Sequence, residues 1–300
     1  MDTVMELTVY GPEDTLRECE NIIKSLEKKL SVTDPGSEIY ALNAQGTAQV
    51  SDETVLLIRD ALFWCEKTSG ALDISIYPVL KAWGFTADAY RVPSEEELAE
   101  LLLLADHTGV TIEGNTVILR EGMQIDLGSV AKGYTGDKIM EALTSAGIRS
   151  ALINLGGNVQ VLGKKPDGSP WKVAIADPVQ SGYIGYIETD GGAVITSGGY
   201  QRFFEEDGVT YHHIIDPSTG YPARSGLLSV TVIGNCGEMC DALSTALFVL
   251  GTEKAADFWR REGGFEAVLV ADDGHILITE GLKDSFHALS GGKVTVIGRD

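Results

Sequence analysis

The sequence predicts an α+β protein in which helices pack on the core of a largely antiparallel sheet. Two observations lead to this fold class. Early in the chain, long segments carry apolar residues at helical spacing, whereas the second half contains consecutive short apolar runs broken by glycine and aspartate. Helices followed by consecutive strands favour α+β over an alternating βαβ arrangement.

Amphipathic spacing and local start and stop signals predict the helices. In the stretch "PSEEEL", Ser94 is placed to cap a helix, and Glu97 stands at the capping-box position. Gly70 fits the end of the preceding helix. We expect helices at residues 13–30, 51–68, from 94 onward, 126–147, 241–250 and near 253–263.

The strands are expected to be short and joined by glycine-containing turns. "GVTIEGNTVILR" alternates on both sides of Gly114 and Asn115, which predicts a hairpin. Further strands are expected at residues 5–11, 150–155, 158–163, 171–176, 183–188, 193–197, 211–215, 227–233, 266–271, 275–279 and 293–297.

The chain has neither internal repeats nor a low-complexity linker, so its 300 residues are expected to form a single domain, 1–300. The one candidate for a subdomain boundary lies near residues 105–125.

The charge of the chain argues against nucleic acid as a partner. Lys and Arg total 23 against 44 Asp and Glu, a formal net charge of -21, and such a surface repels phosphate backbones. A phosphorylated ligand would therefore need local compensation from a metal ion, a lysine or backbone N–H groups. No apolar run approaches the ~20 residues of a membrane span. Because the chain opens almost directly into the strand "MELTVYG", we expect that an upstream segment has been removed.

The four cysteines are interpreted as small, mostly buried side chains. Cys19 and Cys65 fall in expected helices, and Cys236 and Cys240 do not have the CxxC spacing of redox or zinc sites.

The first segment that is a candidate for a functional site is "IDLGSVAKGY", residues 125–134. A strand is expected to end and a helix to begin at Gly128 and Ser129. The unpaired N–H groups of the first helical turn would then point outward beside Lys132, an arrangement that suits phosphate. A P-loop is excluded because Tyr134 stands where its lysine is required. Helix capping by Ser129 is the alternative explanation.

The second segment is "CDALSTALFVLG", residues 240–251. Asp241, Ser244 and Thr245 have i, i+3, i+4 spacing, which places their oxygens on one helical face. Hard cations such as Mg²⁺ take oxygen ligands of this kind. The alternative is that Asp241 caps the helix and the two hydroxyls are exposed.

The third segment is "HHIIDPSTGYPA", residues 212–223. His213 is expected to end a strand just before a tight turn, where scaffolds often place catalytic groups. Imidazole titrates near pH ~6.5 and suits a general base. His212 should point to the opposite face of the strand. The alternative is that either histidine is only a half-buried sheet residue.

Taken together and in order, six segments resemble the ApbE-type flavin transferases, FAD:protein FMN transferases. They are "MDTVMELTVYG", "GALDISIYPVLKAWGF", "IDLGSVAKGYTGDKI", "INLGGNVQVLG", "TSGGYQRFFEEDGVTYHHIIDPSTGYPA" and "DALSTALFVLG". Because the segments extend over nearly the whole chain, the resemblance implies an ApbE-like fold throughout.

The resemblance also implies an activity and a site. The expected enzyme splits FAD with Mg²⁺, attaches FMN through a phosphoester to a threonine or serine of a partner protein, and releases AMP. His213 is the expected catalytic base. The expected metal ligands are Ser129, Asp241, Ser244 and Thr245, although some members carry a second aspartate at the position of Ser244. FAD contacts are expected at Met1, Ala71, Leu72, Asp73, Asp126, Lys132 and Ile215.

The resemblance extends to partners and location. The acceptor is expected to carry a D-x-x-[ST]-G-A-T-like motif and to be a membrane redox subunit. The full-length protein is expected to be extracytoplasmic, as a membrane-anchored lipoprotein. Thr33 stands where some members place an aromatic residue near the flavin, so FAD would be held differently there.

Two other functions fit the same segments. Attack by water would make the protein a Mg²⁺-dependent FAD pyrophosphatase giving FMN and AMP. A flavin-binding carrier would bind FAD without turnover. Glycosidase-like catalysis is disfavoured because no carboxylate pair stands out among the 44 acidic residues.

Overall fold

The structure is a computed structural model that describes residues 3–87, 89–289 and 292–299. The chain forms two compact units. Unit 1 comprises Met1–Ile23, Lys132–Tyr200 and Arg224–Asp300, and unit 2 comprises Lys24–Ala131 and Gln201–Ala223. Two long helices, α1 (Asp14–Leu30) and α6 (Gly128–Ser145), run from one unit into the other. The single-domain organisation expected from the sequence stays a prediction.

Unit 1 is built on a mixed, mostly antiparallel sheet. Its further elements are β1 (Met5–Val9), β5 (Ala151–Leu155), β6 (Asn158–Leu162), β7 (Trp171–Ala176), β8 (Tyr183–Thr189), β9 (Gly191–Gly198), β12 (Leu227–Gly234), α7 (Gly237–Glu262), β13 (Glu266–Ala271), β14 (Ile276–Thr279), η3 (Glu280–Leu282), β15 (Phe286–Ala288) and β16 (Val294–Ile297). Within the described residues, eight strands form one sheet in the order β1-β5-β6-β9-β12-β13-β14-β16. β14 and β16 pair in parallel, and the other neighbours pair antiparallel, as predicted.

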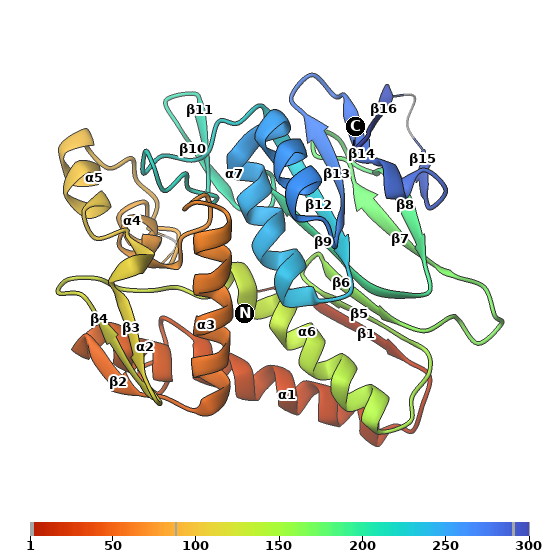
Figure 1. The fold of residues 1–300 in the computed structure, drawn as a ribbon, viewed down its shortest axis with the longest axis horizontal. Coiled ribbons are helices and arrows are strands. Elements are labelled where there is room, and N and C mark those ends of the chain that lie inside the picture. Colours follow the sequence, from red (N-terminus) through yellow and green to blue (C-terminus); the bar gives the residue numbers. More distant parts are fainter. Residues whose placement is uncertain (1–2, 88, 290–291, 300) are drawn as a thin grey trace. The chain divides into compact units, whose positions relative to one another are not determined.

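Alternating side chains let this sheet bury both faces. On β5, Ala151 and Ile153 face a cluster that includes Ile139 of α6, and Leu152 packs on the opposite side. α7 packs along β9 and β12 (Figure 1). The opposite face is covered by the three-stranded sheet β15-β8-β7, whose Val173 and Ile175 join the core of the larger sheet.

Unit 2 is mainly helical. Its elements are α2 (Glu38–Gln45), β2 (Thr47–Gln49), α3 (Asp52–Lys67), η1 (Ile74–Ile76), α4 (Tyr77–Ala82), α5 (Glu95–Leu102), η2 (His107–Gly109), β3 (Val110–Glu113), β4 (Thr116–Leu119), β10 (Phe203–Glu206) and β11 (Val209–His212). Fully buried Trp83 packs in an apolar cluster with Phe85, Leu98 and Ile215, and its indole N–H donates to the carbonyl of Gly220 at 2.8 Å. The β10–β11 hairpin contributes Phe204 and Tyr211 to this cluster.

Several local predictions are confirmed. Ser94 accepts a hydrogen bond from the backbone N–H of Glu97, and β3 and β4 pair around Gly114 and Asn115. The capping box, in contrast, is not formed. The Glu97 carboxylate pairs with the guanidinium group of Arg91, which is a charged donor. In the part of the chain that the structure describes, no helix has the length and apolarity needed to cross a membrane.

The two helices expected at 241–250 and 253–263 are confirmed: α7 consists of two helical segments that meet at a kink, where Gly251 is non-helical at φ 75°, and the first segment starts at Gly237. Two other local predictions are wrong. The strand expected at 211–215 ends at His212, so His213 follows β11 and does not close it. Asp126, and not Ser129, accepts the hydrogen bond from the N–H of Gly128 at the start of α6.

The helices α6 and α7 approach each other through glycine. A methyl group at Gly133 would lie 2.1 Å from the carbonyl oxygen of Gly237 and 2.8 Å from Cβ of Asp241. The Gln160 side chain donates to the Gly133 carbonyl at 2.8 Å, and the Asp137 carboxylate accepts from the N–H groups of Gly237 and Glu238 at 2.7 and 2.8 Å. Residues of α6 and β6 therefore fix the N-terminus of α7.

We expect Gly133→Ala to destabilise the protein by about 1–3 kcal/mol, the usual cost of overpacking. Alanine normally favours a helix over glycine by about 1 kcal/mol, but here the clashing atoms are largely backbone and cannot rotate away. Urea unfolding checks this. The control is Gly191→Ala, where the nearest atom would be the Val161 carbonyl oxygen at 3.6 Å, an ordinary contact. Equal unfolding midpoints for the two variants would contradict the close approach.

Candidate functional site

A buried carboxylate on α7 is the centre of the candidate site in unit 1. Asp241 lies in the second turn of α7 and is 3% exposed. Its Oδ2 accepts a hydrogen bond from the backbone N–H of Gly133 at 2.9 Å, and its Oδ1 lies 3.8 Å from Nζ of Lys132. Since α7 begins four residues earlier, Asp241 is not the N-cap, and the capping alternative is wrong. The cap contacts come from Asp137 of α6.

The charge of this carboxylate is only partly compensated. Burial raises the pKa of Asp241, while the positive charge of Lys132, the nearby Asn158 side chain and the backbone N–H of Gly133 act in the opposite direction. A carboxylate held in this balance is favourable for a bound cation, which would stabilise the ionised form.

Hydroxyl groups surround the same turn of the helix. Ser244 donates to the carbonyl of Asp241 at 2.9 Å, one turn earlier. The Ser197 hydroxyl of β9 lies 2.8 Å from the Ser244 hydroxyl and 3.2 Å from that of Thr245. Asp241, Ser244 and Thr245 thus lie together as their spacing predicted, although Ser244 is fully buried and not exposed.

The donor set fits a hard cation. The carboxylate, the hydroxyls and the carbonyl of Asp241 are all oxygen donors, which Mg²⁺ prefers, and no thiol or imidazole belongs to this cluster among the described contacts. Ser244 already donates to a carbonyl and contacts Ser197, so Thr245, which is half-buried, offers the more accessible hydroxyl.

Sequence reasoning missed Ser197, Asn158 and Gln160 as parts of this site. The segments "ITSGGYQRFF" and "LINLGGNVQVLG" signalled them only through glycine pairs. Ser197 reaches α7 because β9 pairs with β12, a long-range contact that sequence spacing does not reveal.

The two adjacent histidines in unit 2 have different hydrogen bonds. The ring Nδ1 of His213 lies 3.1 Å from the carbonyl oxygen of Arg202. A carbonyl only accepts, so Nδ1 carries the proton, and a neutral ring then has its lone pair on Nε2. His213 is therefore held in the tautomer that a base working through Nε2 requires.

Both ring nitrogens of His212 form hydrogen bonds with backbone groups. Nε2 donates to the carbonyl of Ala223 at 3.0 Å, so Nδ1 has the lone pair and accepts from the N–H of Ile214 at 3.3 Å. These bonds tie the end of β11 to the following turn. These contacts are those of a structural residue at the end of β11.

The other expected FAD contacts in the described chain, except Lys132, also lie in unit 2. Asp73 caps η1 by accepting from Ser75, and the N–H of Asp126 donates to the carbonyl of Ile74 at 2.8 Å. The segments containing Ala71–Asp73 and Asp126 are therefore adjacent. Ile215 pairs with Pro222 in the buried cluster around Trp83, so its side chain supports this cluster and only its backbone is polar.

The expected site residues thus fall into two groups. Asp241, Ser244, Thr245 and Lys132 lie together in unit 1. Ser129, Ala71, Leu72, Asp73, Asp126, His213 and Ile215 belong to unit 2. Ser129 is the second residue of α6, three residues before Lys132. Met1 lies outside the described residues.

Comparison with known proteins gives a consistent result. The sequence profile of the ApbE family matches residues 1–269. An FAD:protein FMN transferase of Treponema pallidum is 37% identical over 295 residues, covering 91% of this chain and 82% of the relative. Another, from Vibrio cholerae, is 34% identical over 245 residues, covering 79% and 73%.

Solved structures agree with the sequence comparison. The ApbE protein of Thermotoga maritima matches with a TM-score of 0.87 at 35% identity and covers 94% of both chains. The flavin transferase ApbE of Vibrio cholerae matches with a TM-score of 0.85 at 29% identity, covering 95% of this chain and 96% of the other. The predicted α+β fold of the ApbE type is confirmed.

Proposed function

This chain belongs to the ApbE family, as the six sequence segments predicted, and we propose that it is a Mg²⁺-dependent FAD:protein FMN transferase. The substrate is FAD. FMN is attached by a phosphoester bond to a threonine or serine of an acceptor protein, and AMP is released. The observation that supports this most is the buried Asp241 carboxylate beside Lys132 of α6, with the hydroxyls of Ser197, Ser244 and Thr245 clustered one turn further along α7.

The cation site of this proposal consists of Asp241, Ser244, Thr245 and Ser129, with Asp241 the charged ligand. When bound, Mg²⁺ supplies positive charge that stabilises the pyrophosphate oxygens. Lys132 adds a permanent positive charge beside Asp241. Such compensation is needed because FAD is anionic and the chain has a formal charge of -21.

His213 is the general base of the proposed reaction. Its Nε2 accepts the proton of the acceptor hydroxyl, whose oxygen forms a bond to the phosphorus of the FMN half. The phosphorus–oxygen bond to the AMP half breaks, and AMP leaves with that electron pair. The hydrogen bond from Nδ1 to Arg202 supports this role because it keeps the ring in one orientation and one tautomer.

FAD recognition is assigned to Met1, Ala71, Leu72, Asp73, Asp126, Lys132 and Ile215. The contact between Asp126 and Ile74 supports a shared role for the 71–73 and 126 segments. The acceptor is proposed to carry a D-x-x-[ST]-G-A-T-like motif and to be a membrane redox subunit. The extracytoplasmic, lipid-anchored location stays a prediction.

The transferase is tested by incubating an acceptor peptide carrying that motif with the protein, FAD and Mg²⁺, followed by mass spectrometry. We expect the peptide to gain one FMN, AMP to appear in solution, and EDTA to abolish both. A peptide with valine in place of the acceptor threonine is the matched control. Free FMN and AMP with an unmodified peptide would favour the pyrophosphatase, and intact FAD would favour the carrier.

Asp241→Asn should raise the Mg²⁺ concentration for half-maximal activity at least about tenfold, equivalent to ~1.4 kcal/mol. The amide keeps the size of the side chain but removes the ligand charge. Activity measured across a Mg²⁺ titration checks this. Asp257→Asn, on the same helix with its side chain 72% exposed, is the control and should behave like the wild type. An unchanged Mg²⁺ titration for Asp241→Asn would exclude this carboxylate as a ligand.

His213→Ala should lower the rate of transfer by about 10²–10⁴, the usual contribution of a positioned base, with FAD affinity nearly unchanged. The measurements are single-turnover transfer and FAD titration by fluorescence. His275→Ala is the control, since the ring of this partly buried histidine of unit 1 bonds to the Thr295 hydroxyl and its backbone N–H donates to the Asp273 carboxylate. Loss of FAD affinity in proportion to lost activity would show that His213 acts in binding instead.

A further inference from the structure

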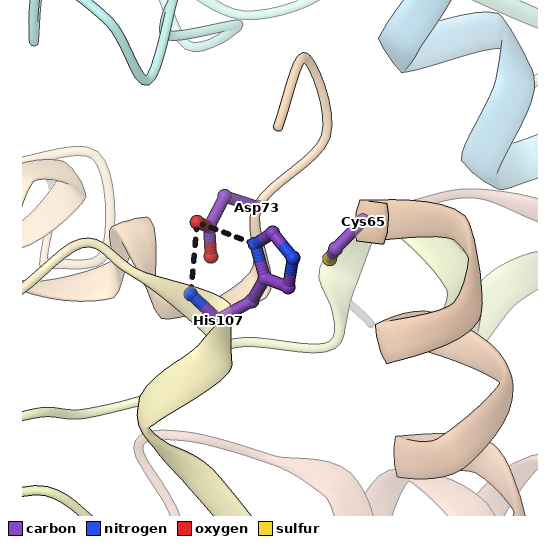
Figure 2. A group of neighbouring side chains, drawn as sticks. All are labelled: Cys65, Asp73 and His107. Carbon is purple, nitrogen blue, oxygen red and sulfur yellow. Dashed lines mark hydrogen bonds and ion pairs between the residues drawn. The ribbon is translucent and has the colours of Figure 1, made fainter. Parts of the chain in front are cut away.

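We propose that Cys65, Asp73 and His107 form a second metal site, in unit 2, for a divalent transition-metal ion of the zinc class. The thiol comes from the last turns of α3, the carboxylate from the residue before η1, and the imidazole from the first residue of η2. In Figure 2 the three side chains point toward one another. This proposal rests on the side chains of unit 2 alone and does not depend on the proposed flavin transfer.

The distances are close to those of a metal site. One ligand atom from each residue lies within 4.8 Å of the other two. His107 Nδ1 and Asp73 Oδ2 are 3.3 Å apart. Tetrahedral zinc, with bonds of about 2.0–2.3 Å, separates its ligand atoms by about 3.3–3.8 Å. The nitrogen and oxygen are therefore already at ligand spacing, and the Cys65 sulfur lies within 4.8 Å of a ligand atom of each of the other two residues.

The surrounding hydrogen bonds hold the carboxylate in place. Oδ1 of Asp73 accepts from the N–H and hydroxyl of Ser75 at 2.8 and 2.6 Å. Oδ2 accepts from the N–H of His107 at 3.1 Å and faces its ring. Metal ligands typically have such supporting contacts, which fix their orientation before the ion binds. An ion bound by both residues would take the place of the hydrogen bond between Nδ1 and Oδ2.

Burial suits an enclosed ion. Cys65 has no exposed surface, the Asp73 side chain is 6% exposed, and the His107 side chain is 19% exposed. Burial, together with the nearby Asp73 charge, raises the pKa of the Cys65 thiol to about 12. An ion that binds this sulfur displaces the thiol proton.

The same three residue types could form a nucleophile, a base and an orienting acid. Burial argues against that role, because a substrate carbon cannot reach a thiol with no exposed surface. The mixed sulfur, nitrogen and oxygen donors select a zinc-class ion over Mg²⁺, which prefers oxygen. Among the described residues, no other group of His, Cys, Asp and Glu side chains meets the same spacing.

The experiment uses the reduced, full chain, stripped of metal by a chelator and dialysed, then titrated with Co²⁺ as a spectroscopic probe. We expect thiolate-to-Co²⁺ charge-transfer absorption that saturates at one ion per chain and is displaced by Zn²⁺. An oxygen-only site around Asp241 cannot produce this absorption. Zn²⁺ should also raise the unfolding temperature, because it ties together residues far apart in the sequence.

Cys65→Ser and His107→Ala should each lose the absorption and the thermal shift, with their metal-free folds checked by circular dichroism. Cys19→Ser is the matched control, since Cys19 is a buried helical cysteine in unit 1, and it should keep both signals. If Cys65→Ser does not fold, His107→Ala decides. The proposal is overturned by absent absorption in the wild type, by its persistence in either variant, or by its loss in the control.

Discussion

The candidate site in unit 1 depends on one constraint, the close approach of α6 and α7 at Gly133 and Gly237. Without side chains at these positions, the backbone N–H of Gly133 comes within 2.9 Å of the Asp241 carboxylate. That single contact keeps the charge at a defined place in the interior, and Lys132, the preceding residue of α6, adds its ammonium group. The helix crossing therefore determines both the position and the electrostatic environment of Asp241.

The adjacent histidines show how backbone carbonyls can assign different chemistry to the same side chain. His212 bonds through both nitrogens, and the ring is tied to Ala223 and Ile214. His213 donates from Nδ1 to Arg202, which leaves the lone pair on Nε2. A chain turn immediately after β11 produces this difference, since it takes His213 out of the strand. The sequence places the two histidines on opposite faces of a strand, but it does not reveal these different hydrogen-bond partners.

How far the sequence predicts this protein depends on the range of the contacts. Asp241, Ser244 and Thr245 were grouped correctly because their spacing lies within one helix. The capping alternative for Asp241 was wrong because the true cap, Asp137, comes from another helix 100 residues earlier than Gly237. The sequence gives no indication that Cys65 and His107 lie together. Metal motifs are recognised in a sequence by short spacings between ligands, and these two residues come together only in the folded chain.

Donor chemistry keeps the two candidate cation sites distinct. Around Asp241 the donors are carboxylate, hydroxyl and carbonyl oxygens. These are the ligands that Mg²⁺ prefers, and they include none of the nitrogen or sulfur donors that favour a zinc-class ion. Around Asp73 a thiol and an imidazole join one carboxylate, and Mg²⁺ has little affinity for either. Asp73 also ends the segment assigned to FAD, so an ion there would fix that segment to α3 and η2 through its ligands. The two donor sets would thus suit different ions, a hard cation for phosphate chemistry around Asp241 and a softer one for local order around Asp73.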